Sequence, residues 1–170
     1  WVESRRMLVG EKVRLTNRIT ASLKSYFPQV LDWFEDKDTL VFCAFIEQFP
    51  SVLDAQAASP EQLTQFFRSH QAGRKSAISR RIRQIQDAGP PLTRDDAIVV
   101  PAQSLTCALI ALLKVVLTQL NDFNAKIVTL FESMPDAELF STLPGAGPHL
   151  APRLLVAFGA ERDRFASAQA

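Results

Sequence analysis

A glycine-rich turn near the end of the chain, residues 143–147 (LPGAG), combines residue types that can hold a phosphate group. Gly145 and Gly147 permit positive φ angles and let the backbone approach a ligand closely. The amides of Gly145, Ala146 and Gly147 would then point outward at a helix N-terminus, where an anion is favoured. Arg153 would add positive charge. The sequence predicts a phosphate contact here, and a purely structural turn between two helices is the alternative.

A second candidate contact is residues 68–83, which include six basic residues and no acidic one. Because Ile78, Ile82 and Ile85 mark the buried stripe of a helix, basic side chains are expected on its other faces. A basic helix face neutralises phosphates and loses affinity as salt rises; a solvated helix is the alternative. The predicted nucleic-acid contacts are Arg74, Lys75, Arg80, Arg81 and Arg83.

The overall charge is nearly balanced, with a formal net charge of +1, so only its distribution indicates a partner. The first predicted helix carries a further basic series, which is Arg5, Arg6, Lys12, Arg14 and Arg18. Two basic stretches in a nearly neutral chain favour a polarised surface.

Residues that catalyse reactions or bind metals are not grouped in this sequence. His70 and His149 lie far apart and have neither the spacing nor the cysteine partners of a zinc site. The acidic residues between 32 and 38 are more typical of a solvated turn with a helix cap than of a two-metal nuclease site. The sequence has neither a P-loop nor a nucleophile elbow. We therefore predict no catalytic residue, no metal site and no cofactor.

The elements that position these residues are all predicted to be helical. Strand-like alternation and hairpin turns are nearly absent, and only 6 residues are glycine. We predict an all-α helical bundle, with Asp38 capping the second helix and Ser59-Pro60 starting the third. The predicted helices span residues 2–26, 39–49, 60–70, 74–88, 101–134, 136–142 and 148–158.

The longest predicted helix, residues 101–134, carries apolar residues at alternating spacings of four and three, the pattern of a coiled-coil seam. At 1.5 Å per residue it would be roughly 50 Å long, so it needs a partner along its length. We favour a second copy of the chain, and a core helix within one chain is the alternative. The predicted assembly seam is Leu109, Leu113, Val116, Leu120, Phe123, Ile127, Leu130 and Met134.

The cellular setting is indicated by the cysteines and by hydropathy. Cys43 and Cys107 lie in apolar stretches, and we interpret both as buried reduced thiols, which fits a reducing cytoplasm. The most hydrophobic window, residues 98–117, contains Pro101 and Lys114. A spanning helix needs about 20 predominantly apolar residues, so we predict no membrane segment.

Residues 136–158 resemble a helix-hairpin-helix motif. Its pattern of an apolar residue, glycine, a small residue, glycine and a later alanine is matched by Pro144, Gly145, Ala146, Gly147 and Ala151. Pro152 departs from the pattern, because a proline inside the second helix removes one backbone hydrogen bond.

The order of these parts resembles the IS-one-hundred-ten family of insertion-sequence transposases. The opening ESRRMLVGEKVRLTNRITASLKSYFPQVL is similar to the segment that follows the family's RuvC-like domain. The end, LFSTLPGAGPHLAPRLLVAFGAERDRFASAQA, is similar to the start of its C-terminal transposase domain. The resemblance divides the chain into an assembly region, residues 1–135, and the start of that domain, residues 136–170. Both ends look cut, so we interpret the chain as part of a longer protein.

The resemblance implies a bacterial cytoplasmic protein that moves DNA with the guidance of a structured non-coding RNA. Four acidic residues, with a divalent metal such as Mg²⁺, would lie in a RuvC-like domain before Trp1, and a catalytic serine would follow Ala170. Neither Ser141 nor Ser167 matches the serine motif, so this chain is expected to be non-catalytic. Its implied partners are DNA, the RNA and further copies of itself, as a homodimer or larger oligomer. The alternatives are a helical oligomerisation module that binds no nucleic acid and a stand-alone helix-hairpin-helix DNA-binding protein.

Overall fold

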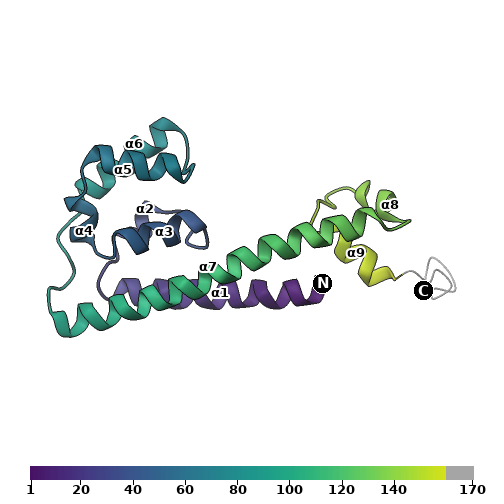
Figure 1. The fold of residues 1–170 in the computed structure, drawn as a ribbon, viewed down its shortest axis with the longest axis horizontal. Helices are drawn as coiled ribbons and strands as arrows, with labels where there is room; N and C mark the ends of the chain where they lie inside the picture. Colours follow the sequence, from purple (N-terminus) through teal and green to yellow (C-terminus); the bar gives the residue numbers. More distant parts are fainter. Residues whose placement is uncertain (160–170) are drawn as a thin grey trace. The chain divides into compact units, whose positions relative to one another are not determined.

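The computed structural model describes residues 1–159, which form helices and no strand, so the predicted all-α class is confirmed (Figure 1). Residues 160–170, with Ser167 and the end of the segment that resembles a transposase domain, lie outside the described residues. The helices are α1 (Val2–Lys24), α2 (Val30–Trp33), α3 (Leu40–Gln48), α4 (Val52–Ala57), α5 (Pro60–Ser69), α6 (Lys75–Gln86), α7 (Asp96–Glu132), α8 (Ala137–Ser141) and α9 (Ala151–Phe158).

The chain divides into two compact units, each described by itself below. The larger unit is Gly10–Leu117, and the smaller unit combines Trp1–Val9 with the chain from Thr118 onward. Helices α1 and α7 each contribute residues to both units. This division differs from the predicted boundary after residue 135, because the end of α7 packs with the first residues of α1.

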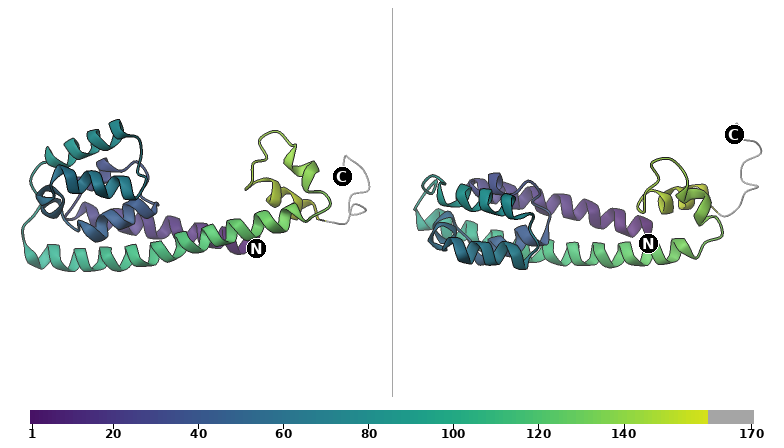
Figure 2. Two further views of the ribbon diagram at one scale, coloured as in Figure 1. Left: turned by 45° about the horizontal axis from the view of Figure 1, so that its top comes forward. Right: turned by 90° about the horizontal axis from the view of Figure 1, so that it is seen from above.

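Aromatic side chains fill the core of the larger unit. Phe45 and Phe67 are fully buried and stacked, with ring centroids 5.9 Å apart, and Phe34 packs against both. Helix α1 runs beside the first part of α7, where the hydroxyls of Ser22 and Thr106 hydrogen-bond at 2.8 Å (Figure 2). Burying such large rings is a major source of stability in a domain of this size.

Side-chain caps mark the starts of α3, α4 and α5. Ser59 and Gln62 form a reciprocal capping box ahead of α5, as the Ser59-Pro60 pair predicts. The cap of α3 is Thr39, whose hydroxyl accepts from the amide of Phe42, and the prediction of Asp38 as the cap is wrong. Asp38 instead forms an ion pair with Lys12 of α1.

Helix α7 begins five residues before its predicted start at Pro101. The carboxylate of Asp95 accepts from the amide of Ala97 at 2.9 Å and caps the helix ahead of the proline. Pro101 therefore lies inside α7, near its start, where it removes only one backbone hydrogen bond.

The smaller unit joins the start of α1 to the end of α7. The rings of Trp1 and Phe123 meet edge to face at 5.1 Å, and the ammonium of Lys126 lies 5.0 Å from the Trp1 ring. Helices α8 and α9 form a hairpin in which the rings of Phe140 and Phe158 lie 5.8 Å apart.

The two cysteines differ in exposure. Cys43 is fully buried in the larger unit, and burial raises the pKa of its thiol to about 12. Cys107 is exposed on α7, which corrects the prediction that both thiols are buried.

A thiol-labelling experiment on the folded chain is expected to modify Cys107 and spare Cys43. The thiolate is the nucleophile, and Cys43 is both covered and held protonated by its raised pKa. Mass spectrometry after alkylation at neutral pH measures the two sites, with a denatured sample as control. Equal labelling of both cysteines in the folded chain would contradict this placement.

Candidate functional site

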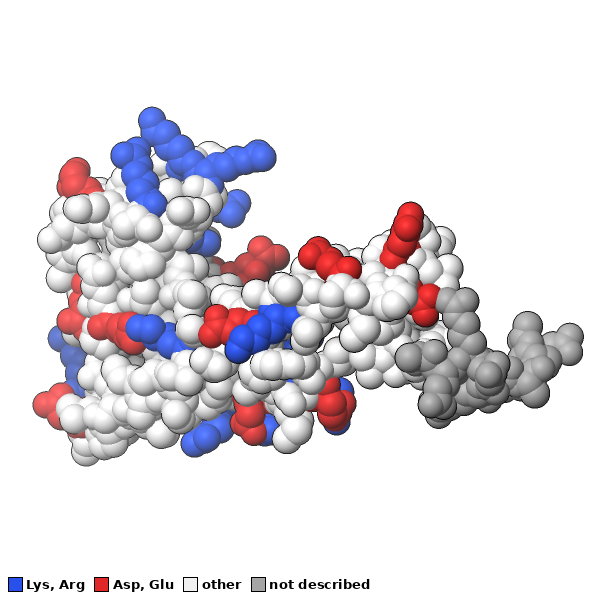
Figure 3. Space-filling view, turned by 45° about the vertical axis from the view of Figure 1, so that its right-hand side comes forward, with Lys and Arg blue, Asp and Glu red and all other residues white. Residues whose placement is uncertain are grey.

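Helix α6 exposes a set of basic side chains. Lys75, Arg80 and Arg83 on the helix and Arg74 at its N-cap are all exposed, while Ile78, Ile82 and Ile85 are buried as predicted. None of the four cations forms an ion pair with a carboxylate in the part of the chain that the structure describes. Figure 3 shows Lys and Arg side chains projecting together from the region of α5 and α6. We call Arg74, Lys75, Arg80 and Arg83 the α6 basic face.

The structure separates Arg81 from this face and corrects its predicted role. Its guanidinium is half-buried and donates to the backbone oxygens of Trp33 at 2.6 Å and Ala72 at 3.3 Å. It also lies 4.8 Å from the ring of Phe34 and 5.1 Å from that of Phe67. Burial lowers the pKa of Arg81, and the nearby charge of Arg80 adds to this. Arg81 therefore connects α6 to the core and is not available to a phosphate.

The glycine turn holds one of its two glycines in a conformation that needs glycine. Gly145 has a φ of 79°, as predicted. The amide of Ala146 donates to the backbone oxygen of Leu143, and that of Gly147 to the oxygen of Gly145, both at 3.0 Å. Two of the three amides predicted to face an anion are thus used inside the turn.

Helix α9 starts later than predicted, at Ala151 instead of residue 148. Pro152 consequently lies in the first turn of α9. Backbone N–H groups in the first turn have no acceptor within the helix, so a proline there costs no helical hydrogen bond. The proline that departs from the helix-hairpin-helix pattern is therefore compatible with this helix.

The two glycines are expected to respond differently to substitution. Gly145→Ala forces an alanine into the left-handed region and should cost roughly 1–2 kcal/mol. Gly147→Ala should have little effect, because its φ is not in that region and a Cβ there meets no atom within 4 Å. Hydrogen exchange of the backbone amides in α8 and α9 measures the loss of stability in each variant. Equal losses from the two variants would contradict the observed turn.

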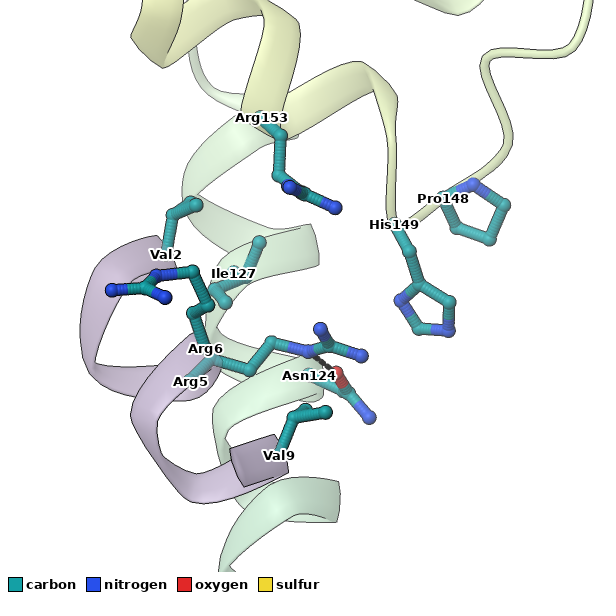
Figure 4. Close-up of a pocket in the computed structure, with 9 residues that line it drawn as sticks. All are labelled: Val2, Arg5, Arg6, Val9, Asn124, Ile127, Pro148, His149 and Arg153. Carbon is teal, nitrogen blue, oxygen red and sulfur yellow. Dashed lines mark hydrogen bonds between the residues drawn. The ribbon is translucent and has the colours of Figure 1, made fainter. Parts of the chain in front are cut away.

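Arg153 lies in a pocket of about 100 Å³ in the smaller unit, between α1, α7 and the turn that precedes α9 (Figure 4). In Figure 4 the side chains of Arg5, His149 and Arg153 border one space. Arg5 donates through Nε to the side-chain oxygen of Asn124. The sequence identified Arg153 as a candidate contact but did not predict that it lies near Arg5 and His149. No local signal predicts this pocket, because Arg5 and Asn124 are 119 residues apart in the chain.

Within its own chain, the predicted assembly seam of α7 is largely covered. In the larger unit Leu109 and Leu113 belong to the core, with 3% and 0% of their surface exposed. In the smaller unit Leu120 and Ile127 are buried. Only the end of the predicted seam, Leu130 and Met134, is exposed, in an apolar groove shared with α9. Most of this seam therefore packs inside one chain, so it is not free to contact a second copy.

Helix α7 carries a second apolar seam that sequence reasoning missed. Six residues of the larger unit follow alternating spacings of three and four, and all are exposed. The four largest side chains have exposed fractions from 46% to 61%. No charged residue occurs between Asp96 and Lys114, so this face presents only apolar and small polar groups. We call it the outer seam, and its residues are Ile98, Pro101, Leu105, Ala108, Leu112 and Val115.

The same helix is long and apolar enough to cross a membrane by length and composition alone. Its most apolar window has a mean hydropathy of 1.9, and 22% of that window is buried. The core helix of a globular protein satisfies the same two criteria, so they do not by themselves decide what contacts the outer seam.

No group of three or more His, Cys, Asp or Glu residues that could hold a metal ion occurs among residues 1–159. Comparisons with protein-family models, with curated proteins and with solved structures found no match for this chain.

Proposed function

We propose that this chain is a non-catalytic part of a DNA transposase that assembles copies of the protein and contacts nucleic acid. The observation that carries the proposal is the outer seam of α7. This uncharged apolar face has heptad spacing, and its residues are exposed in their own unit. The α6 basic face supports the nucleic-acid role, and the family resemblance at both ends of the chain connects the two.

A second copy of the chain is the occupant that best fits the outer seam. Its residues recur at the a and d spacing through which parallel or antiparallel helices pair with themselves. The a-type positions Ile98, Leu105 and Leu112 are large and half-exposed, and burying each would contribute about 1 kcal/mol. A seam of this size supports a coiled-coil dimer whose population depends on protein concentration.

The α6 basic face is suited to the phosphate backbone of DNA or structured RNA. Arg80 and Arg83 are three residues apart and are neighbours on the helix surface. Arginine guanidinium groups bind phosphate oxygens in a bidentate manner, independently of sequence. Such contacts position a nucleic acid and make its affinity depend strongly on salt.

The alternative functions differ in what supports them. An oligomerisation module without nucleic-acid binding is favoured by the outer seam alone. A stand-alone helix-hairpin-helix DNA-binding protein has less support, because the amides of Ala146 and Gly147 bond inside the turn. We also propose a cytoplasmic location, because in this proposal a second copy of the chain, and not lipid, covers the outer seam.

Binding and flotation experiments on the same preparation test the proposal. The chain is titrated with labelled duplex DNA and with structured RNA at low and high salt, and is mixed with neutral liposomes before flotation. We expect nucleic-acid binding that weakens steeply with salt, and no flotation. Absence of binding at low salt would support the oligomerisation module instead. Flotation with the liposomes would show that lipid covers the outer seam.

The parent protein is tested by the gene sequence on both sides of this segment. We expect a RuvC-like domain with four acidic residues upstream and a serine-bearing domain downstream. A continuous reading frame that contains neither would contradict the transposase proposal.

A further inference from the structure

The pocket beside the glycine turn brings together cationic and hydrogen-bonding groups from three segments of the smaller unit. Arg5 comes from α1, Asn124 from α7, and His149 and Arg153 from the turn and first residues of α9 (Figure 4). No aspartate or glutamate lines it. Val2, Val9 and Ile127 form its apolar wall.

From this geometry we infer that the pocket binds a single phosphate group. Two guanidinium groups and an imidazole border a space with room for an ion of several heavy atoms. Paired arginines give a phosphate charge-assisted hydrogen bonds in fixed directions. The apolar wall lowers the local dielectric constant and strengthens those bonds relative to an open surface.

Arg5 is held in place for this role. Its Nε donates to the side-chain oxygen of Asn124, and its two terminal nitrogens have no hydrogen-bond acceptor among the described residues. They therefore remain available to an anion. An arginine fixed by a neighbour loses less side-chain entropy when it binds a ligand.

Arg6 lines the same pocket but is already neutralised. Its Nε donates to both carboxylate oxygens of Glu3, at 2.9 Å and 3.0 Å. Figure 4 shows its guanidinium turned away from those of Arg5 and Arg153. The pKa of Glu3 is lowered chiefly by its hydrogen bond from Arg6, and the charge of Arg153 is the smallest of the causes. The Glu3–Arg6 pair thus offers a matched control on the same helix.

We assign this phosphate to a nucleic-acid strand, and this assignment rests on the proposed function. The hairpin would then contact phosphate through the side chains of His149 and Arg153, and not through the turn amides predicted from its glycines. The pocket lies in the smaller unit and the α6 basic face in the larger, so each contact can be tested separately.

Proton NMR of the two histidines in the full chain tests the inference with inorganic phosphate as the probe. The chain contains only His70 and His149, and His70 lies in the larger unit, so it serves as an internal reference. At fixed pH and ionic strength, phosphate is expected to shift the His149 ring signals until they saturate, while chloride does not. Arg5→Gln and Arg153→Gln should each weaken phosphate binding by about tenfold or more. Removing both members of the Glu3–Arg6 ion pair, as Glu3→Gln with Arg6→Gln, keeps the net charge and should have little effect.

The outcomes separate this inference from the proposed function. If the shift at His149 is absent or does not saturate, the phosphate site is overturned. It is also overturned if Glu3→Gln with Arg6→Gln weakens binding as much as Arg5→Gln does. A 5′-phosphorylated oligonucleotide that competes with inorganic phosphate would support the assignment to a strand, and failure to compete would overturn that step. Saturable phosphate binding in a chain that binds no DNA or RNA would uphold the pocket and contradict the proposed function.

Discussion

Leu105→Glu combined with Leu112→Glu is expected to convert the chain from a dimer into a monomer. Both side chains are half-exposed in the single chain, so the substitutions should cost little stability there. In a dimer built on the outer seam, they would place four carboxylates at the interface, two from each copy. Burying unpaired charge is strongly unfavourable, and like charges repel. Sedimentation velocity measures the change directly.

The matched control for this variant is Leu53→Glu. Leu53 lies on α4 in the same unit and is 49% exposed, against 50% for Leu105, but it lies off the outer seam. The control should sediment like the unaltered chain. If Leu53→Glu dissociated the dimer equally, or the double variant left it intact, the outer seam would not be the interface.

Replacing the four cations of the α6 basic face by glutamine is expected to reduce nucleic-acid affinity by roughly a thousandfold at about 0.1 M salt. Each lost phosphate contact removes the release of nearly one counterion, so the logarithmic salt slope should fall by about four units. The four substitutions lie on exposed positions and leave the buried isoleucines of α6 unchanged. Fluorescence anisotropy with labelled DNA over a salt series measures both quantities. The substitutions are Arg74→Gln, Lys75→Gln, Arg80→Gln and Arg83→Gln.

A control with the same change in net charge separates a local contact from a general charge effect. It replaces four other cations by glutamine, three on α1 and one between α2 and α3, which are Arg14, Arg18, Lys24 and Lys37. Arg14 already pairs with Glu11, so it is a poor phosphate ligand. We expect the control to retain most of the affinity. An equal loss in both variants would show that bulk charge, and not the α6 basic face, drives binding.

The features that the sequence predicted correctly depend on local signals. The start of α5 follows from Ser59, Pro60 and Gln62, which are close together in the chain. The buried stripe of α6 follows from the spacing of its isoleucines, and the positive φ of Gly145 from the absence of a side chain. Each can be deduced without knowing what packs nearby.

The features that the sequence did not predict depend on distant residues. In the sequence, Arg81 cannot be distinguished from its basic neighbours. In the structure it donates hydrogen bonds to the backbone oxygens of Trp33 and Ala72. The pocket beside the glycine turn needs Arg5 beside Asn124 and Arg153, which only the fold brings together.

The outer seam shows a different limit of sequence reasoning. Helix α7 has two interleaved heptad patterns, one through Leu109 and Leu113 and one through Leu105 and Leu112. A single sequence indicates that both faces are apolar but not which one the chain covers itself. The structure covers the first face and leaves the second exposed.

If the unaltered chain self-associates through the outer seam, its mass in solution increases with protein concentration. One chain has a mass of 18.9 kDa. Light scattering over a wide range of protein concentrations is predicted to show the mass rising from that of one chain to that of two. A mass of 18.9 kDa at every concentration would show that the chain does not self-associate.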